Sequence, residues 1–222
     1  MALYVLDWSN GYPSDLKGYA GAVRYIGSPG HAKNLTKPEV AQWRAQGVPL
    51  SFVHEQDAGW MLGGHLRGQS AGLAVHKDAV TLGLTLRGVF AACDFKPSAA
   101  QMPLVLACLK GFGEILGHDV ASIYGSASVL NAAHAAGLLP HGGWQIVAWS
   151  YVNGKLVVSP YAVLLQHTQQ ITLHGVKCDL NTVNAKDWRQ SPAPSGVTPI
   201  PPAPAPIPKR HYYPHRFAYT PR

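Results

Sequence analysis

Eight short apolar runs, separated by segments that favour helix or turn, constrain this chain more than any other feature of its sequence. The runs are rich in β-branched residues, as buried strands are. They cover residues 3–7, 21–27, 48–55, 88–95, 120–125, 144–150, 162–166 and 175–180. Strands that alternate with helices pair in parallel through βαβ crossovers, so eight such units predict a compact (β/α)8 barrel of the TIM-barrel type.

Helix signals lie between several of these runs. Thr36 and Glu39 form a capping box, Ser126 can cap another helix, and longer helices are expected over residues 62–82 and 98–116. Residues 150–162 are too short and too interrupted by Gly and Pro for a full helix, so we expect a less regular second half. A doubly wound open sheet is the alternative, but no G-x-G-x-x-G follows the first run.

The last 32 residues, 191–222, hold ten of the 18 prolines. Proline fixes φ and removes a backbone donor, so neither helix nor sheet is expected there. The chain is therefore predicted to consist of a barrel domain over residues 1–190 and a Pro-rich tail. The end of this tail, residues 209–222, mixes cations with aromatic rings and is either a solvated basic end or a peptide that docks on a partner.

Charge and composition exclude several classes of function. The tail contributes four cations and no acid to the net charge of +7, so the barrel lacks the basic surface that nucleic-acid binding requires. No apolar run is long enough to span a membrane, and the N-terminus lacks the features of a signal peptide. We expect a protein that is cytoplasmic in the producing cell or leaves it in a virion. The 11 His and three Cys show no ligand spacing, so no metal or other cofactor is expected.

Four of the 11 acidic residues lie at or next to the end of a predicted strand: Asp7, Glu55, Asp94 and Asp179. A (β/α)8 barrel builds its active site at that end, from several strands. Each acid could instead cap a helix or pair with a cation, above all Asp179, whose segment can start a helix. Carboxylates that lie close together raise one another's pKa. Paired carboxylates are also the groups that cleave glycosidic bonds. Candidates for substrate contact at the same ends are Trp8, Arg24, Tyr25, Tyr124, Trp149 and Gln166, of which Tyr25 and Trp149 also fit a core role.

Several segments together resemble a known family. They are LDWSNGYPS, GYAGAVRYIG, KNLTKPEVAQWRAQGVPLSFVHE, GVFAACDF, IYGS, LLQHT and CDLN. In this order they are similar to the glycoside-hydrolase-like domain of unknown function 1906, found in actinobacterial envelope proteins and their phages and related to family-25 lysozymes. The resemblance covers about residues 1–188. It implies a barrel whose carboxylate-lined pocket faces cell-wall or other envelope glycan.

The resemblance also assigns site residues by position. Asp7 matches the aspartate of the first strand, Glu55 the glutamate of the third, Asp94 the aspartate of the fourth, and Asp179 the aspartate of a late D-x-N signature. Family-25 lysozymes carry D-x-E on the fourth strand, with that glutamate as general acid. This chain has Lys96 in its place, and a lysine does not have the pKa of such an acid.

Two functions follow from these residues. The first is a glycosidase acting on peptidoglycan or related glycan, as a phage lysin or virion-associated protein. In this function Glu55 donates the proton, and Asp94 either stabilises the oxocarbenium-like centre or orients the substrate carbonyl. Asp7 and Asp179 position sugar or water. The second is a structural virion protein that binds glycan without turnover and is fastened to a protein partner by residues 209–222. A host enzyme acting on a small carbohydrate is a third hypothesis, which leaves the tail unexplained.

Overall fold

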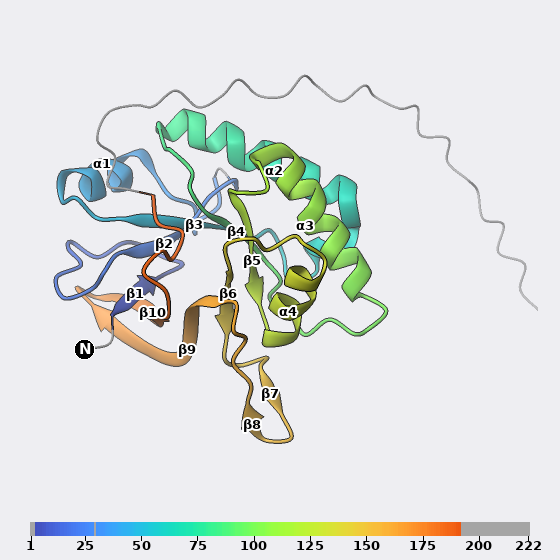
Figure 1. Ribbon diagram of the computed structural model, residues 1–222. Helices are drawn as coiled ribbons and strands as arrows, with labels where there is room; N and C mark the ends of the chain where they lie inside the picture. Colours follow the sequence, from blue (N-terminus) through green and yellow to red (C-terminus); the bar gives the residue numbers. More distant parts are fainter. Residues whose placement is uncertain (1–2, 29, 192–222) are drawn as a thin grey trace, which may run out of the picture.

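The computed structural model describes residues 3–28 and 30–191, so the predicted tail from residue 192 onward lies outside the described residues. Eight strands close into a barrel in the order β1-β10-β9-β6-β5-β4-β3-β2 (Figure 1). The barrel predicted from the alternation of apolar runs is therefore confirmed. Within the described residues, no helix combines the length and apolar character needed to cross a bilayer.

Each of the eight predicted runs overlaps one barrel strand, although some strands extend beyond their runs. These are β1 (Tyr4–Asp7), β2 (Ala22–Tyr25), β3 (Leu50–His54), β4 (Val89–Ala92), β5 (Ala121–Gly125), β6 (Gly143–Ile146), β9 (Ala162–Leu173) and β10 (Val176–Val183). The helices are α1 (Lys37–Ala45), η1 (Trp60–Gly63), α2 (Gly64–Leu82), α3 (Met102–Leu116) and α4 (Ala127–Ala135). A hairpin of β7 (Tyr151–Val152) and β8 (Lys155–Leu156) follows β6 where a helix would complete a regular barrel, and projects from the body.

The barrel closes through antiparallel strands rather than a further parallel unit. Strand β10 runs antiparallel to both β9 and β1, whereas the other neighbours are parallel. A tight turn at His174 and Gly175 joins β9 to β10, and both residues have positive φ, 50° and 81°. Such a turn matches the twist of an antiparallel hairpin. The segment around Asp179, which the sequence also allows to start a helix, is part of strand β10.

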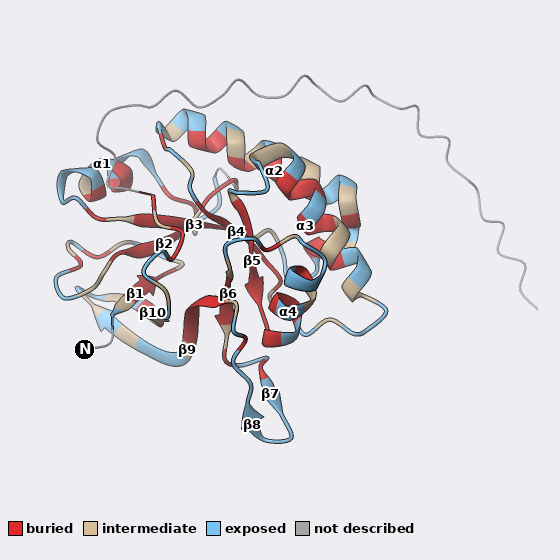
Figure 2. Ribbon diagram, viewed as in Figure 1, coloured by how far each residue is buried: buried red, intermediate tan, exposed pale blue. Residues whose placement is uncertain are grey.

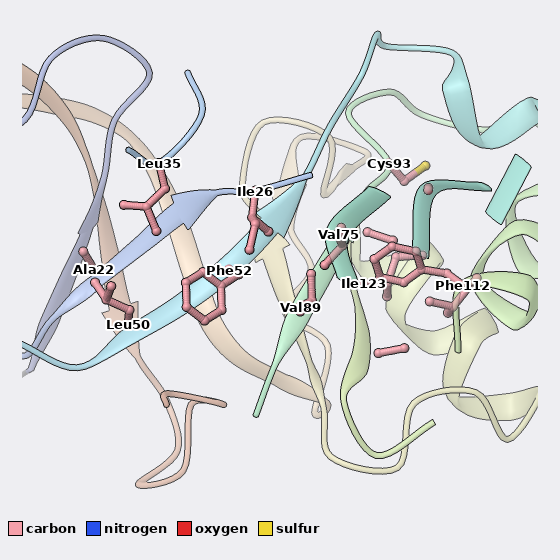
Figure 3. Close-up of a cluster of buried hydrophobic side chains, with 14 of the residues drawn as sticks. Ala22, Ile26, Leu35, Leu50, Phe52, Val75, Val89, Cys93, Phe112 and Ile123 are labelled. Atoms are coloured by element: carbon pink, nitrogen blue, oxygen red, sulfur yellow. The ribbon is translucent and has the colours of Figure 1, made fainter. Parts of the chain in front are cut away.

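Strand alternation sorts the side chains into two layers. Successive residues of a strand point to opposite faces, so one set fills the barrel and the other meets the helices. The interior set comprises Val5, Val23, Val53, Phe90, Ala92, Tyr124, Trp144 and Leu164, completed by Trp188 from the segment after β10. The exterior set, with Ile26, Phe52 and Ile123, packs against Val75 of α2 and Phe112 of α3 (Figure 3). Figure 2 shows burial concentrated on the strands and inner helix faces, with the β7–β8 hairpin exposed.

Helices α2 and α3 lie against each other on one flank of the barrel, and glycines set their separation. A Cβ atom added at Gly68 would lie 1.9 Å from the carbonyl oxygen of Cys108. A Cβ added at Gly111 would lie 2.2 Å from the carbonyl oxygen of His65. Neither backbone oxygen can rotate away as a side chain could. The two helices therefore pack this closely only because both positions lack a side chain.

We expect Gly68→Ala to lower the free energy of unfolding by about 2 kcal/mol or more, because overpacking outweighs the gain in helix propensity of about 1 kcal/mol. Urea denaturation measures the change. Ser70→Ala, at an exposed position of the same helix, is the matched control and should shift stability by less than about 0.5 kcal/mol. Equal stability of the Gly68 variant and the wild type would show that the helices can move apart without cost.

Candidate functional site

A cavity of about 380 Å³ lies at the C-terminal end of the barrel. It is lined by Tyr25, Lys33, Val53, Glu55, Ala92, Asp94, Tyr124, Trp144, Ile146, Ala148, Gln166, His167, Thr168 and Asp179. Tyr25, Ala92 and Ile146 are the last residues of β2, β4 and β6, so the strand ends themselves form its wall. This is the face on which (β/α)8 barrels build their sites.

Six of the ten predicted site residues line this one cavity. They are Glu55, Asp94, Asp179, Tyr25, Tyr124 and Gln166. Asp7 lies directly behind them, buried, and accepts a hydrogen bond from the side-chain amide of Gln166 at 3.1 Å. The structure thus brings all four predicted carboxylates to one end of the barrel, where they were expected from the strand pattern.

Asp7 is the centre of a hydrogen-bond network that crosses five strands. Its Oδ2 accepts from Gln166 of β9 and, at 2.8 Å, from the amide of Asn181 of β10. Asn181 in turn accepts from the indole N–H of Trp144 at 2.7 Å, and Gln166 accepts from the hydroxyl of Tyr124 at 2.7 Å. Each of the five side chains in this network has a hydrogen-bond partner, as burial requires. The network fixes the floor of the cavity.

The buried position of Asp7 changes its protonation. Burial and, to a lesser degree, the negative charge of Asp179 raise the pKa of Asp7 from 3.8 to about 7, against the lowering effect of the hydrogen bonds from Asn181 and Gln166. Burial also raises the pKa of the Tyr25 and Tyr124 hydroxyls, which therefore remain neutral hydrogen-bonding groups. Near neutral pH the floor of the cavity thus contains a carboxyl group that can hold a proton.

Asp179 reaches the site by a different route from the other acids. It lies within β10, which runs antiparallel, so it is not at the C-terminal end of a parallel strand. Its Cα pairs directly with that of Asp7 across the β1–β10 ladder. Directly paired residues of neighbouring strands project from the same face of a sheet. The strand register therefore brings Asp179 to Asp7, and Gln170 holds its carboxylate with an N–H···O bond of 2.8 Å.

Glu55 and Asp94 have different partners. The ammonium group of Lys33 donates to Glu55 Oε1 at 2.9 Å and lies 5.0 Å from the centre of the Tyr25 ring. The indole N–H of Trp149 donates to Asp94 Oδ1 at 3.4 Å. Trp149 is 41% exposed and does not line the cavity, although it bonds one of its carboxylates. Glu55 is therefore part of an ion pair, whereas Asp94 accepts a hydrogen bond from a neutral donor.

Trp8 and Arg24, both predicted to contact substrate, lie in the layer between barrel and helices instead. Trp8 packs against Trp43 of α1, with the ring centres 5.7 Å apart. The guanidinium carbon of Arg24 lies over the Trp8 ring, 4.6 Å from its centre. Arg24 also forms a buried ion pair with Glu39 of α1 at 2.6 Å. The Glu39 carboxylate is therefore directed to Arg24 rather than back to the helix start, so only the Thr36 half of the predicted capping box forms.

The inward–outward alternation of strand residues could have shown from the sequence that Trp8 and Arg24 point away from the cavity. Asp7 and Tyr25 share the inward face with Val5 and Val23, so Trp8 and Arg24, one position away, point outward. It could also have identified Trp144 and Asn181, which share the inward face of β6 and β10. Lys33 lies in the loop between β2 and α1, and no periodic pattern indicates where a loop side chain points. Among the described residues, no three His, Cys, Asp or Glu side chains are placed to hold a metal ion.

A family model for Rv2525c-like, glycoside hydrolase-like domains matches residues 15–190. The chain belongs to this family. The match covers every barrel strand except β1 (Tyr4–Asp7), and it confirms the family resemblance found in the sequence segments. No curated protein matches the chain.

Solved structures share the fold at low sequence identity. The Tat-secreted protein Rv2525c of Mycobacterium tuberculosis, in complex with L-tartrate, superposes with a TM-score of 0.73 at 20% identity over 84% of this chain and 98% of that one. The catalytic domain of endolysin ply40 from Listeria monocytogenes bacteriophage P40 gives 0.58 at 15%, over 83% and 94%. The autolysin LytC of Streptococcus pneumoniae, in complex with a synthetic peptidoglycan ligand, gives 0.57 at 13%, over 82% and 46%. The glycoside-hydrolase-like barrel is thus common to these proteins.

The raised pKa of Asp7 predicts how stability depends on pH. Between pH 3.8 and about 7 the unfolded chain has an ionised Asp7 while the folded protein keeps it protonated, so stability falls as pH rises, by up to about 1.4 kcal/mol per pH unit. Asp7→Asn mimics the neutral acid. We expect its stability relative to the wild type to increase steadily from pH 4 to pH 7 in urea denaturation.

The control is Asp119→Asn. Asp119 is an exposed acid that precedes the N-terminal end of β5, away from the cavity, so this variant should show the same dependence of stability on pH as the wild type. A variant at Asp7 that loses stability relative to the wild type as pH rises would mean that the folded protein holds this carboxyl ionised.

Proposed function

We propose that this protein acts on peptidoglycan or a related cell-envelope glycan, as a glycosidase whose substrate occupies the cavity at the C-terminal end of the barrel. The observation that supports this most is that Glu55, Asp94 and Asp179 line one cavity together with two tyrosines. Carboxylates supply the acid and the stabilising charge for glycosidic cleavage, and aromatic rings offer surfaces for sugar rings. The shared fold of LytC and ply40, one a peptidoglycan-bound autolysin and the other an endolysin, supports the same substrate class.

Within this proposal the acids have separate roles. Asp94, which bonds only the neutral indole of Trp149 among the described side chains, stabilises the positive charge that develops at the sugar. Glu55 is the candidate proton donor, and Lys33 must leave its carboxylate before a proton can occupy it. Asp7 and Asp179 form the floor that positions sugar or water. Tyr25, Tyr124 and Gln166 contact the substrate.

A second candidate function is glycan binding without turnover. Two observations favour it: the ammonium of Lys33 bonds the proposed acid, Glu55, and Lys96 stands where the related lysozymes have their general acid. The side chain of Lys96 is exposed and does not line the cavity, so it offers no replacement acid. In this case the barrel is a glycan-recognising part of a larger assembly.

A muramidase assay separates the two candidates. We expect the wild type to release reducing ends from peptidoglycan, and Glu55→Gln and Asp94→Asn to lose about 100-fold or more of this rate, as is typical when an acid or a stabilising charge is removed. Asp119→Asn is again the control and should retain full activity. Binding of glycan by a wild type that releases no reducing ends would establish the second candidate, and absence of both binding and cleavage would reject the glycan proposal.

We propose in addition that the protein acts at the envelope of a bacterial host as part of a phage particle, with residues 209–222 docked on a virion protein. This basic, aromatic segment lies outside the described residues, and its sequence supports the proposal. Ser191 belongs to the barrel, since its backbone pairs with Leu50 and its hydroxyl bonds the carbonyl of Thr85 at 2.7 Å. A truncation should therefore begin at residue 192.

Deletion of residues 192–222 should abolish incorporation into particles while glycan binding by the purified barrel stays unchanged. Incorporation is measured by immunoblot of purified particles, and binding by pull-down on insoluble cell wall. Replacement of Tyr212, Tyr213, Phe217 and Tyr219 by Ser in the full chain keeps the charge of the tail and should have the same effect. Normal incorporation of the truncated protein would reject the docking role.

A further inference from the structure

Lys33 places a positive charge inside an otherwise acidic cavity. Three carboxylates line this space, and Lys33 carries the only ammonium or guanidinium group among the described residues that line it. Its side chain is 33% exposed, and its Nζ bonds Glu55 at 2.9 Å beside the face of Tyr25. Lys33 begins one of the segments that carry the family resemblance, but neither that resemblance nor the strand pattern assigned it a role in the site.

Buried groups hold the backbone around Lys33 in place. The carbonyl oxygen of Lys33 accepts a hydrogen bond from Arg24 Nη2 at 3.2 Å, and Arg24 is itself fixed by Glu39. The next residue, Asn34, donates at 2.8 Å to the carboxylate of Asp78, which is 5% exposed and comes from α2. Such support keeps a functional group in position without fixing its flexible end. Arg24 thus serves the cavity indirectly, by positioning Lys33.

The ammonium group has donors to spare. A lysine presents three N–H donors, and the bond to Glu55 uses one of them. Elsewhere along the wall an anionic group of a ligand would meet Glu55, Asp94 or Asp179 and be repelled. A single ammonium matches a singly charged carboxylate. A phosphate, which carries more charge, would need further cations to offset the three acids.

We propose that Lys33 is a specificity-determining residue that binds the carboxylate of an acidic saccharide in the cavity, with the sugar ring against Tyr25. This inference rests on the proposed glycan-directed function and names the kind of sugar that the site prefers. In peptidoglycan the lactyl carboxylate of muramic acid is free only where no stem peptide is attached. Within peptidoglycan the site would therefore prefer strands from which an amide-hydrolysing reaction has removed the peptide.

Two matched ligands test this preference. One is the disaccharide of N-acetylglucosamine and N-acetylmuramic acid, and the other is the same disaccharide with its carboxylate converted to the carboxamide. We expect the wild type, in calorimetric titration, to bind the acid about ten-fold more tightly than the amide, the effect of one charge-assisted hydrogen bond in a partly exposed site. Lys33→Met should bind both equally, and Lys33→Arg should restore part of the preference.

Two further variants separate direct contact from overall charge. Lys96→Met removes a lysine outside the cavity and should keep the ten-fold preference. The double variant Lys33→Met/Glu55→Gln has the same cavity charge as the wild type but lacks the ammonium, so it should show no preference. Recovery of the preference in this double variant would overturn the contact with Lys33.

The outcomes also distinguish this inference from the function on which it rests. Equal binding of both disaccharides by the wild type would overturn the role of Lys33 and leave a glycan-binding cavity. Binding of neither would reject the glycan-directed function and, with it, this inference. Loss of both ligands in Lys33→Met alone, with the fold intact by circular dichroism, would show that Lys33 holds the cavity together rather than selects the ligand.

Discussion

The closure of the barrel between its first and last strands is the constraint on which the site depends. β10 enters this seam antiparallel, and its register sets Asp179 opposite Asp7. Side-chain hydrogen bonds then tie Asp7 to Asn181 and Gln166, and through them to Trp144 and Tyr124. Each of these polar groups is costly to bury alone, so they stabilise the protein only as a complete set. The same set forms the floor of the cavity, so stability and site geometry rest on one network.

Above this floor the cavity combines opposite charges. Asp7 takes up a proton near neutral pH because it is buried beside another acid, whereas Lys33 offsets part of the negative charge at the rim. The arrangement differs from a simple pair of carboxylates, because one proposed catalytic acid is already bonded to a cation. Proton transfer by Glu55 would therefore depend on whether a bound ligand draws Lys33 away from its carboxylate. This dependence on Lys33 links the two candidate functions, glycan cleavage and glycan binding without turnover.

Much of the fold was accessible from the sequence, since the apolar runs are short, β-branched and separated by capped helices. Ser126, for example, caps α4 as expected, with its hydroxyl accepting from the Val129 N–H at 3.4 Å. The positions of Glu55 and Asp94 were equally accessible, because the end of a parallel strand predicts the face of a barrel. Strand ends alone also predict Trp8 and Arg24 as site residues, because that rule ignores the alternation that turns one residue inward and the next outward.

The sequence by itself determined the closed barrel, the family and the strand ends at which acids gather, because these follow from periodicity and local signals along the chain. Only the tertiary structure decided which side chains meet. The antiparallel entry of β10, the pairing of Asp179 with Asp7 and the reach of Lys33 to Glu55 join segments far apart in sequence. No local pattern encodes such contacts, since strand register and loop direction are set by how the whole barrel packs.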